Sequence, residues 1–241
     1  MERHIQTLIF SIIFSIFSVP LIPQESQENR VRFSLWAQTE VYPGYFDERV
    51  GEHERSMNEI KDNDEWYSVP VRKIREIAPF LVEGMVYGWK FSYTPYDKAR
   101  GVEEFFEFSP INELSEDEKS KIGYKNPWSE DGKLSVWVEF QRTPSQINRF
   151  RSWNSVLHPK IKGVGFSKLA FGFDGIRLAS EEALKNAVRE YARTRIKTKP
   201  KEISGTVIVR EPPIIGIDSG RYRVTLDFFM ESDRIIEYKT F

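Results

Sequence analysis

The sequence predicts an α+β protein of mostly antiparallel sheet, with three or four helices and about eight strands, after an N-terminal signal segment. Three observations predict this. Apolar and polar residues alternate over several short stretches, which is typical of half-buried strands. Between these stretches, apolar residues recur at helical spacing after a capping residue. An apolar run near the start of the chain fits a secretory leader.

The leader is the first element. A weakly basic start leads into an apolar run over residues 8–19, which prolines then end. A run of about a dozen apolar residues fits a signal peptide and is short for a bilayer span, which needs roughly 20 residues. We therefore expect residues 1–23 to direct export and residues 24–241 to form the exported domain. The alternative is an uncleaved membrane anchor, because Leu21 and Ile22 lengthen the apolar run.

The first strand is predicted over residues 31–42, where Val31, Phe33 and Leu35 share one side and Trp36 lies on the other. Pro43-Gly44 ends it. The acidic segment that follows, residues 47–65, is typical of a solvated loop.

A unit of helix followed by strand is then predicted three times. In the third helix, Arg193 and Arg195 suit the negative C-terminal end. The units are a helix from Ser68 with a strand over 81–93, a helix capped by Thr143 with a strand over 161–171, and a helix capped by Ser180 with a strand over 203–210.

Each of these three strands opens with a β-branched residue, a spacer and a glycine. The first and third are also followed by proline and a Phe-rich strand. This pattern indicates an internal duplication of residues 68–110 and 180–230. The alternative is coincidence, because glycine is common near strand starts and three-residue matches are frequent. The matches are Val82-Glu83-Gly84, Ile161-Lys162-Gly163 and Ile203-Ser204-Gly205.

Two further strand regions are well marked. Apolar and polar residues alternate over 133–141, after the turn Asp131-Gly132. The C-terminal region alternates over 221–228, and a turn at 231–233 then leads into 234–241, as in a meander.

Composition limits the classes of function. Lys and Arg number 35 and Asp and Glu 36, so the net charge of −1 does not indicate a nucleic-acid partner, which normally requires a basic face. The chain has no cysteine, which excludes disulfides, thiolate metal sites and thiol nucleophiles.

No catalytic, metal or cofactor motif stands out, so we predict none of the three. His53 lacks the second histidine of a zinc motif, and His158 precedes a proline at a helix end. The run from Asp62 resembles a calcium loop, but Trp66 and Tyr67 occupy ligand and glycine positions. Several carboxylates could instead serve a glycoside hydrolase, although on strands they are typical of a solvent face. These are Glu103, Glu104, Glu107, Glu139 and Asp227.

The aromatic residues are the best candidates for a binding site. The chain has 18 Phe, 10 Tyr and 6 Trp, several of them on predicted strands opposite the aliphatic face. Exposed rings of this kind mark binding surfaces. The alternative is a second core that buries the same rings. The candidate binding residues are Trp36, Trp89, Tyr93 and Trp137.

These observations together predict an exported protein of the periplasm or cell envelope. We expect a non-catalytic role in binding an envelope component or a partner protein. A carboxylate-dependent hydrolase of glycan or cell-wall material is one alternative, and a membrane-anchored periplasmic domain is another. The protein would contact a membrane only through an uncleaved N-terminal segment.

Overall fold

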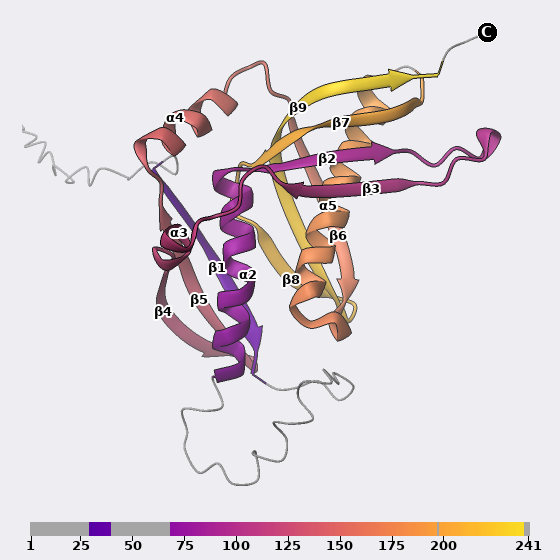
Figure 1. Cartoon of the computed structure of the whole chain (residues 1–241). Helices are drawn as coiled ribbons and strands as arrows, with labels where there is room; N and C mark the ends of the chain where they lie inside the picture. Colours follow the sequence, from indigo (N-terminus) through magenta and orange to yellow (C-terminus); the bar gives the residue numbers. More distant parts are fainter. Residues whose placement is uncertain (1–28, 40–67, 197, 239–241) are drawn as a thin grey trace, which may run out of the picture.

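The computed structural model describes residues 29–39, 68–196 and 198–238 (Figure 1). Within these residues, nine strands form two antiparallel sheets and four α-helices pack against them. The predicted class, α+β with mostly antiparallel sheet, is confirmed. The predicted signal segment and acidic loop lie outside the described residues.

The small sheet has the strand order β1-β5-β4. Phe33 of β1 lies opposite Val138 of β5, and both side chains are buried. The strand predicted over 31–42 is confirmed to residue 38, and the strand over 133–141 is confirmed throughout. The strands are β1 (Arg30–Gln38), β4 (Gly123–Glu130) and β5 (Lys133–Gln141).

The large sheet has the order β3-β2-β7-β9-β6, and β8 also pairs with β9. The predicted turn at 231–233 is wrong, because β9 continues to Glu237. A register shift against Ser204 and Gly205 absorbs one extra residue there, which is a β-bulge. The strands are β2 (Trp89–Thr94), β3 (Phe105–Pro110), β6 (Lys160–Lys168), β7 (Pro200–Val209), β8 (Ile214–Asp218) and β9 (Arg221–Glu237).

The helix predicted behind Thr143 is confirmed. Thr143 and Gln146 form a reciprocal capping box at its start. Ser115 caps a short helix that the sequence did not predict. The α-helices are α2 (Ser68–Val86), α3 (Glu116–Ser120), α4 (Pro144–Trp153) and α5 (Gly172–Arg195), with 3₁₀ turns η1 (Lys98–Arg100) and η2 (Leu169–Phe171).

The strand predicted over 81–93 starts only at Trp89, because residues 81–86 form the last turns of α2. This helix packs against β1, β7 and α5, so its last six residues are all buried and resemble a buried strand in sequence. Gly84 leaves space there, since a Cβ atom would lie 2.4–2.9 Å from the Trp89 ring, which is untenably close. Val82-Glu83-Gly84 is therefore helical, unlike its two matches in strands, and the duplication stays a prediction.

Ser180 does not cap α5, which begins eight residues earlier at Gly172. Ser180 is fully buried, and its hydroxyl donates to the Ile176 carbonyl one turn back. The apolar stripe predicted along this helix is confirmed. The start of the helix was predicted wrongly, because Ser180 lies in its interior.

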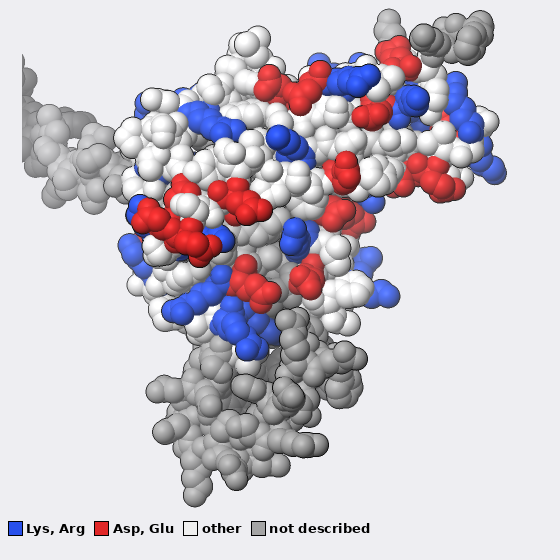
Figure 2. Space-filling model, viewed as in Figure 1, with Lys and Arg blue, Asp and Glu red and all other residues white. Residues whose placement is uncertain are grey.

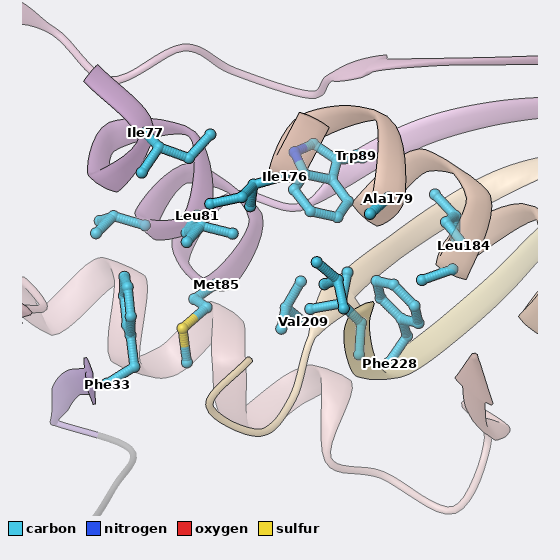
Figure 3. Packing of buried hydrophobic residues seen from close by; sticks show 14 of the residues in the cluster. Phe33, Ile77, Leu81, Met85, Trp89, Ile176, Ala179, Leu184, Val209 and Phe228 are labelled. Atoms are coloured by element: carbon cyan, nitrogen blue, oxygen red, sulfur yellow. The ribbon is translucent and has the colours of Figure 1, made fainter. Parts of the chain in front are cut away.

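The core connects α2 and α5 to both sheets. Figure 3 shows Leu81 of α2 near Ile176 of α5, and Met85 beside Phe33 of the small sheet. A second buried cluster forms where α4 packs on the large sheet, through Phe150, Trp153, Ile208 and Phe229.

Helix α5 lies very close to β6, because the strand carries two glycines where the helix carries alanines. A Cβ atom on Gly163 would overlap the Ala183 carbonyl, and one on Gly165 would overlap the Ala179 carbonyl. The close contact fixes the position of α5 on the sheet, and thus the position of the site described below. None of the helices in the described residues has both the length and the apolar character needed to cross a bilayer.

Candidate functional site

A cavity of about 500 Å³ lies where the C-terminal end of α5 meets the ends of β2 and β7. Its volume is in the range of small-molecule sites, roughly 300–1,000 Å³. The wall is apolar and is formed by Pro95, Ala192, Ile196 and Pro200. We call this cavity the α5 pocket.

Three polar side chains from separate elements meet in the α5 pocket. The Tyr93 hydroxyl donates to Glu104 Oε1 at 2.9 Å, and Arg189 Nη2 donates to the same oxygen at 2.5 Å. Arg189 Nε also donates to the Tyr93 hydroxyl at 3.2 Å. Lys185 lies 3.7 Å from the other Glu104 oxygen. The three groups therefore hold one another in place.

These contacts set the charge of each group. Burial alone would raise the pKa of Glu104, but hydrogen bonds from Arg189 and Tyr93 outweigh burial and lower it. Burial raises the pKa of the Tyr93 hydroxyl, and Glu104 raises it further against the opposing effect of Arg189. Near neutral pH, Glu104 is thus ionised and Tyr93 is protonated.

The rim of the α5 pocket is basic. Arg193 pairs with Glu190 along the helix at 2.8 Å, and the Lys199 ammonium donates to the Tyr96 carbonyl. Among the described residues, no carboxylate lies within ion-pair distance of Lys199. Of the three cations in the lining, Arg189 pairs with Glu104 and Arg193 with Glu190, so Lys199 is the one without a described carboxylate at ion-pair distance, which favours an anionic ligand group.

The cation excess is local. On the face shown in Figure 2, acidic and basic side chains are interspersed without a large region of one sign. The whole chain has a net charge of −1.

A smaller cavity of about 260 Å³ continues along α5 from Glu104. Phe106 of β3 and Leu178 of α5 supply its apolar lining. Glu181, Glu182 and Lys185 supply its other charged groups, and the Glu182 carboxylate accepts the Phe166 N–H of β6. The two cavities share Glu104, which pairs with Arg189 of the α5 pocket and with Lys185 of the smaller cavity.

Trp89 does not have the exposure expected of a binding residue. Its ring is fully buried, stacked on Phe80 at 5.0 Å and edge-on to Phe108 at 5.4 Å. The Tyr93 ring is buried as well, but its hydroxyl reaches the α5 pocket. Both rings belong to the core, as the alternative prediction has it, because α5 and α2 cover this face of the large sheet.

Trp36 and Trp137 belong to the small sheet, away from Trp89 and Tyr93. The Trp36 indole N–H donates to the Ile215 carbonyl at 3.0 Å and so connects β1 to β8. Trp137 is half-buried, with Trp128 at 6.1 Å and the Arg32 guanidinium 4.5 Å above its ring. The four predicted residues therefore do not form one cluster.

The candidate carboxylates are not brought together either. The Glu139 carboxylate forms ion pairs with Lys125 at 2.8 Å and with Arg32 at 3.3 Å. The hydrogen bond from Lys125 is the main reason that the pKa of Glu139 is lowered. Asp227 pairs with Lys162 at 3.2 Å. Neither cavity that Glu104 lines contains Glu103, Glu107, Glu139 or Asp227.

Of the histidine and calcium candidates, His158 is the one that lies in the described residues. The His158 ring lies 4.6 Å from the Trp153 ring, and Nδ1 is 3.1 Å from the Ser155 hydroxyl. In the part of the chain that the structure describes, no three histidine or acidic side chains converge as metal ligands. His53 and the run from Asp62 lie outside that part.

The sequence analysis named Tyr93 and Glu104, but as members of separate candidate sites, and it did not connect them. It assigned Arg193 only to the end of a helix, and it did not consider Arg189 or Lys199. The available signal was weak: Lys185, Arg189 and Arg193 lie four residues apart on one helix face. Spacing alone does not show that this face meets the end of β2.

The fold and the site define an α+β protein with two antiparallel sheets and a basic-rimmed pocket. A protein-family model matches residues 17–238, so the chain belongs to that family, whose description gives no function. The chain is similar to an uncharacterized protein of Treponema pallidum (strain Nichols), with 25% identity over 219 residues that cover 91% of this chain and 86% of the relative. No solved structure matches.

Proposed function

We propose that this is an exported, non-catalytic binding protein of the periplasm or cell envelope. Its ligand carries an anionic group beside an apolar part, and it is an envelope component or a segment of a partner protein. One observation carries the proposal: Arg193 and Lys199 stand at the rim of an apolar-walled cavity of about 500 Å³.

The protonation states favour binding over proton-transfer chemistry. A general acid or base works best with a pKa near the operating pH. Here the pKa of Glu104 is lowered and that of Tyr93 is raised, and both groups are hydrogen-bonded to Arg189. Such a network orients a ligand rather than exchanging protons with it.

Export is supported by the leader pattern. The apolar run over 8–19 is nearly free of charge, whereas 29% of the residues of the whole chain are charged. N-terminal sequencing of the protein from its own cells tests this step. A start between residues 19 and 27 supports a cleaved leader, retention of Met1 with membrane association supports the anchored form, and an intact cytosolic chain contradicts export.

Ligand binding is tested with a small carboxylate that has an apolar body. We expect N-acetylphenylalanine to bind more tightly than its C-terminal amide in calorimetry, because only the carboxylate can pair with Lys199 and Arg193. The double variant R193E/K199E should weaken carboxylate binding at least about tenfold and leave amide binding nearly unchanged. The control is K201E, an exposed lysine outside the pocket lining. Equal affinity for the acid and the amide would contradict the proposal.

A further inference from the structure

The loop between α4 and β6 carries the most exposed large apolar side chains of the described residues. Val156 is 102% exposed and Leu157 is 83% exposed, whereas Ile214 of β8, the next in order, is 65% exposed. Figure 1 shows this segment as a bend at the top of the molecule, beyond the end of α4. We call residues 154–159 the α4 loop. Apolar residues scattered singly over a surface are common, but two together on a projecting bend indicate an interaction site.

The α4 loop is held in this conformation by its own contacts. The Ser155 hydroxyl lies 3.1 Å from His158 Nδ1, and the His158 N–H donates to the Ser155 carbonyl at 3.3 Å. The His158 ring packs against the buried Trp153 ring at 4.6 Å. At the end of the loop, the Met230 N–H of β9 donates to the Pro159 carbonyl at 3.0 Å. The two aliphatic side chains are therefore presented to solvent by a loop that is fixed at both ends.

The charges around the α4 loop are mostly positive. Residues 140–173 contain six Lys and Arg and no Asp or Glu. In the described part of the chain, no carboxylate lies within ion-pair distance of Arg149 or Lys160, which flank the loop. The acidic neighbour of the loop is Glu231, 3.9 Å from His158 Nε2. The six cations are Arg142, Arg149, Arg151, Lys160, Lys162 and Lys168.

The N-terminal apolar run joins the domain beside α4. The Arg142 N–H donates to the Asn29 carbonyl at 3.0 Å, and α4 begins two residues later at Pro144. Ten residues lead from the end of the apolar run over 8–19 to Asn29. Ten residues of chain span at most about 35 Å. A chain that retains this run as a membrane anchor would therefore keep α4 close to the bilayer surface.

We propose that the α4 loop docks on the surface of an anionic lipid bilayer. Val156 and Leu157 insert at the boundary between headgroups and acyl chains, and Arg149 and Lys160 pair with anionic headgroups. A protein partner fits this surface less well, because a standard interface covers about 800 Å² on each side, far more than two aliphatic side chains.

This membrane contact is separate from both sites discussed above. It uses none of the residues that line the α5 pocket, so it does not rest on the proposed ligand. It also adds a second contact to the one that the sequence predicts for an uncleaved N-terminal segment.

The absence of cysteine allows a single reporter to be placed on the loop. Leu157→Cys is labelled with the polarity-sensitive dye NBD, and Ile214→Cys on β8 is the matched control. Each chain, as its own cells process it, is mixed with vesicles of phosphatidylcholine and phosphatidylglycerol. We expect the NBD emission to rise and shift to the blue at position 157 and to stay unchanged at position 214, because only the loop enters the apolar layer.

The readout distinguishes this loop from the N-terminal segment. Vesicle binding without a response at position 157 would overturn the proposal, since another part of the chain would then hold the vesicle. Absence of vesicle binding would overturn it as well. Equal responses at positions 157 and 214 would show that the dye itself drives the contact, which also contradicts the proposal.

Further changes in the labelled Leu157→Cys chain test the two parts of the contact. Val156→Ser should weaken the apparent affinity of the loop for the vesicles at least about threefold, because apolar surface is lost. Lys160→Gln should weaken it about fivefold, since each cation near an anionic surface contributes about that factor. Lys201→Gln, an exposed lysine of β7, is the control and should bind as the parent does.

Vesicles of phosphatidylcholine alone should bind the labelled loop at least about tenfold more weakly, because they carry no net charge. Equal affinity for the neutral and the anionic vesicles would overturn the pairing of Arg149 and Lys160 with headgroups. An unchanged affinity in Val156→Ser would overturn the insertion of the aliphatic side chains.

Discussion

The buried ring of Tyr93 directs its hydroxyl, the side chain's only polar atom, to Glu104, at 2.9 Å from Oε1. A strand residue of the core and a loop carboxylate are thus joined at the pocket. Arg189 binds both partners, so the end of β2, the segment before β3 and helix α5 are held together at one point.

Tyr93→Phe keeps the ring and removes this hydrogen bond. We expect the free energy of unfolding at pH 7 to fall by about 1 kcal/mol, measured by urea denaturation. The pKa of Glu104 should rise, because a hydrogen bond that lowers it is lost.

The pH dependence of this variant follows from linkage. A carboxylate whose folded pKa is lowered contributes stability above its unfolded pKa, and this is lost as pH falls through the folded value. In the Tyr93→Phe variant the Glu104 contribution is smaller, so the difference from wild type should shrink between pH 5 and about pH 3. A difference that stays constant over this range would show that the hydroxyl does not influence Glu104.

Gly163→Ala should be strongly destabilising, because its Cβ would overlap the Ala183 carbonyl of α5. Overpacking of this kind costs about 1–3 kcal/mol, and a backbone atom cannot move aside as a flexible side chain can. The matched control is Gly216→Ala on β8, where no heavy atom lies within 4 Å of the added Cβ. Similar unfolding free energies for the two variants would contradict the close contact of α5 and β6.

Trp36→Phe removes the hydrogen bond between β1 and β8. We expect a loss of about 1 kcal/mol or more, since the Ile215 carbonyl loses its indole donor. Trp137→Phe, on the same small sheet, should cost less because its ring is half-exposed and packs against Arg32 and Trp128. Thermal melts of both variants provide the comparison, and the reverse order of stabilities would contradict these roles.

Glu83→Gln should become more favourable for stability, relative to wild type, as the pH rises from acid to slightly alkaline. Burial raises the pKa of Glu83, although its carboxylate accepts the Leu114 N–H at 2.9 Å. A carboxyl group with a raised folded pKa binds more protons folded than unfolded, so its contribution to stability is lost as pH rises above its unfolded value.

The stability of Glu83→Gln relative to wild type should therefore increase from pH 4.5 to pH 8, measured by chemical denaturation. A flat difference for Glu83→Gln would mean that burial does not affect this carboxyl group.

Local patterns in the sequence predict those elements that have one face in the core and the other in solvent. Strand β5 and helix α4 were predicted correctly because a half-buried strand alternates and a capping box marks a start. The last turns of α2 were mistaken for a strand, because contact with β1, β7 and α5 removes the polar face from its sequence. Strand β4 was not predicted, since its lysine, proline and bulge interrupt any alternation.

The site was less predictable than the fold. Tyr93 was selected for its aromatic ring, whereas its hydroxyl is the part that lies at the pocket. Arg189 is 96 residues from Tyr93 and 85 from Glu104, and Lys199 is 103 from Tyr96. No local spacing encodes such pairs, because the strand order of the large sheet and the small residues between α5 and β6 bring them together.

The pairing of β1 with β5 has a consequence for the order in which the chain folds as it is made. Strand β1 ends at Gln38, and its partner begins at Lys133. As the polypeptide emerges N-terminus first, β1 must wait for almost a hundred further residues before its own partner strand is made, and the β2–β3 hairpin is complete before then. The small sheet therefore takes up its N-terminal strand last in the order of synthesis, after the β4–β5 pair is available to receive it.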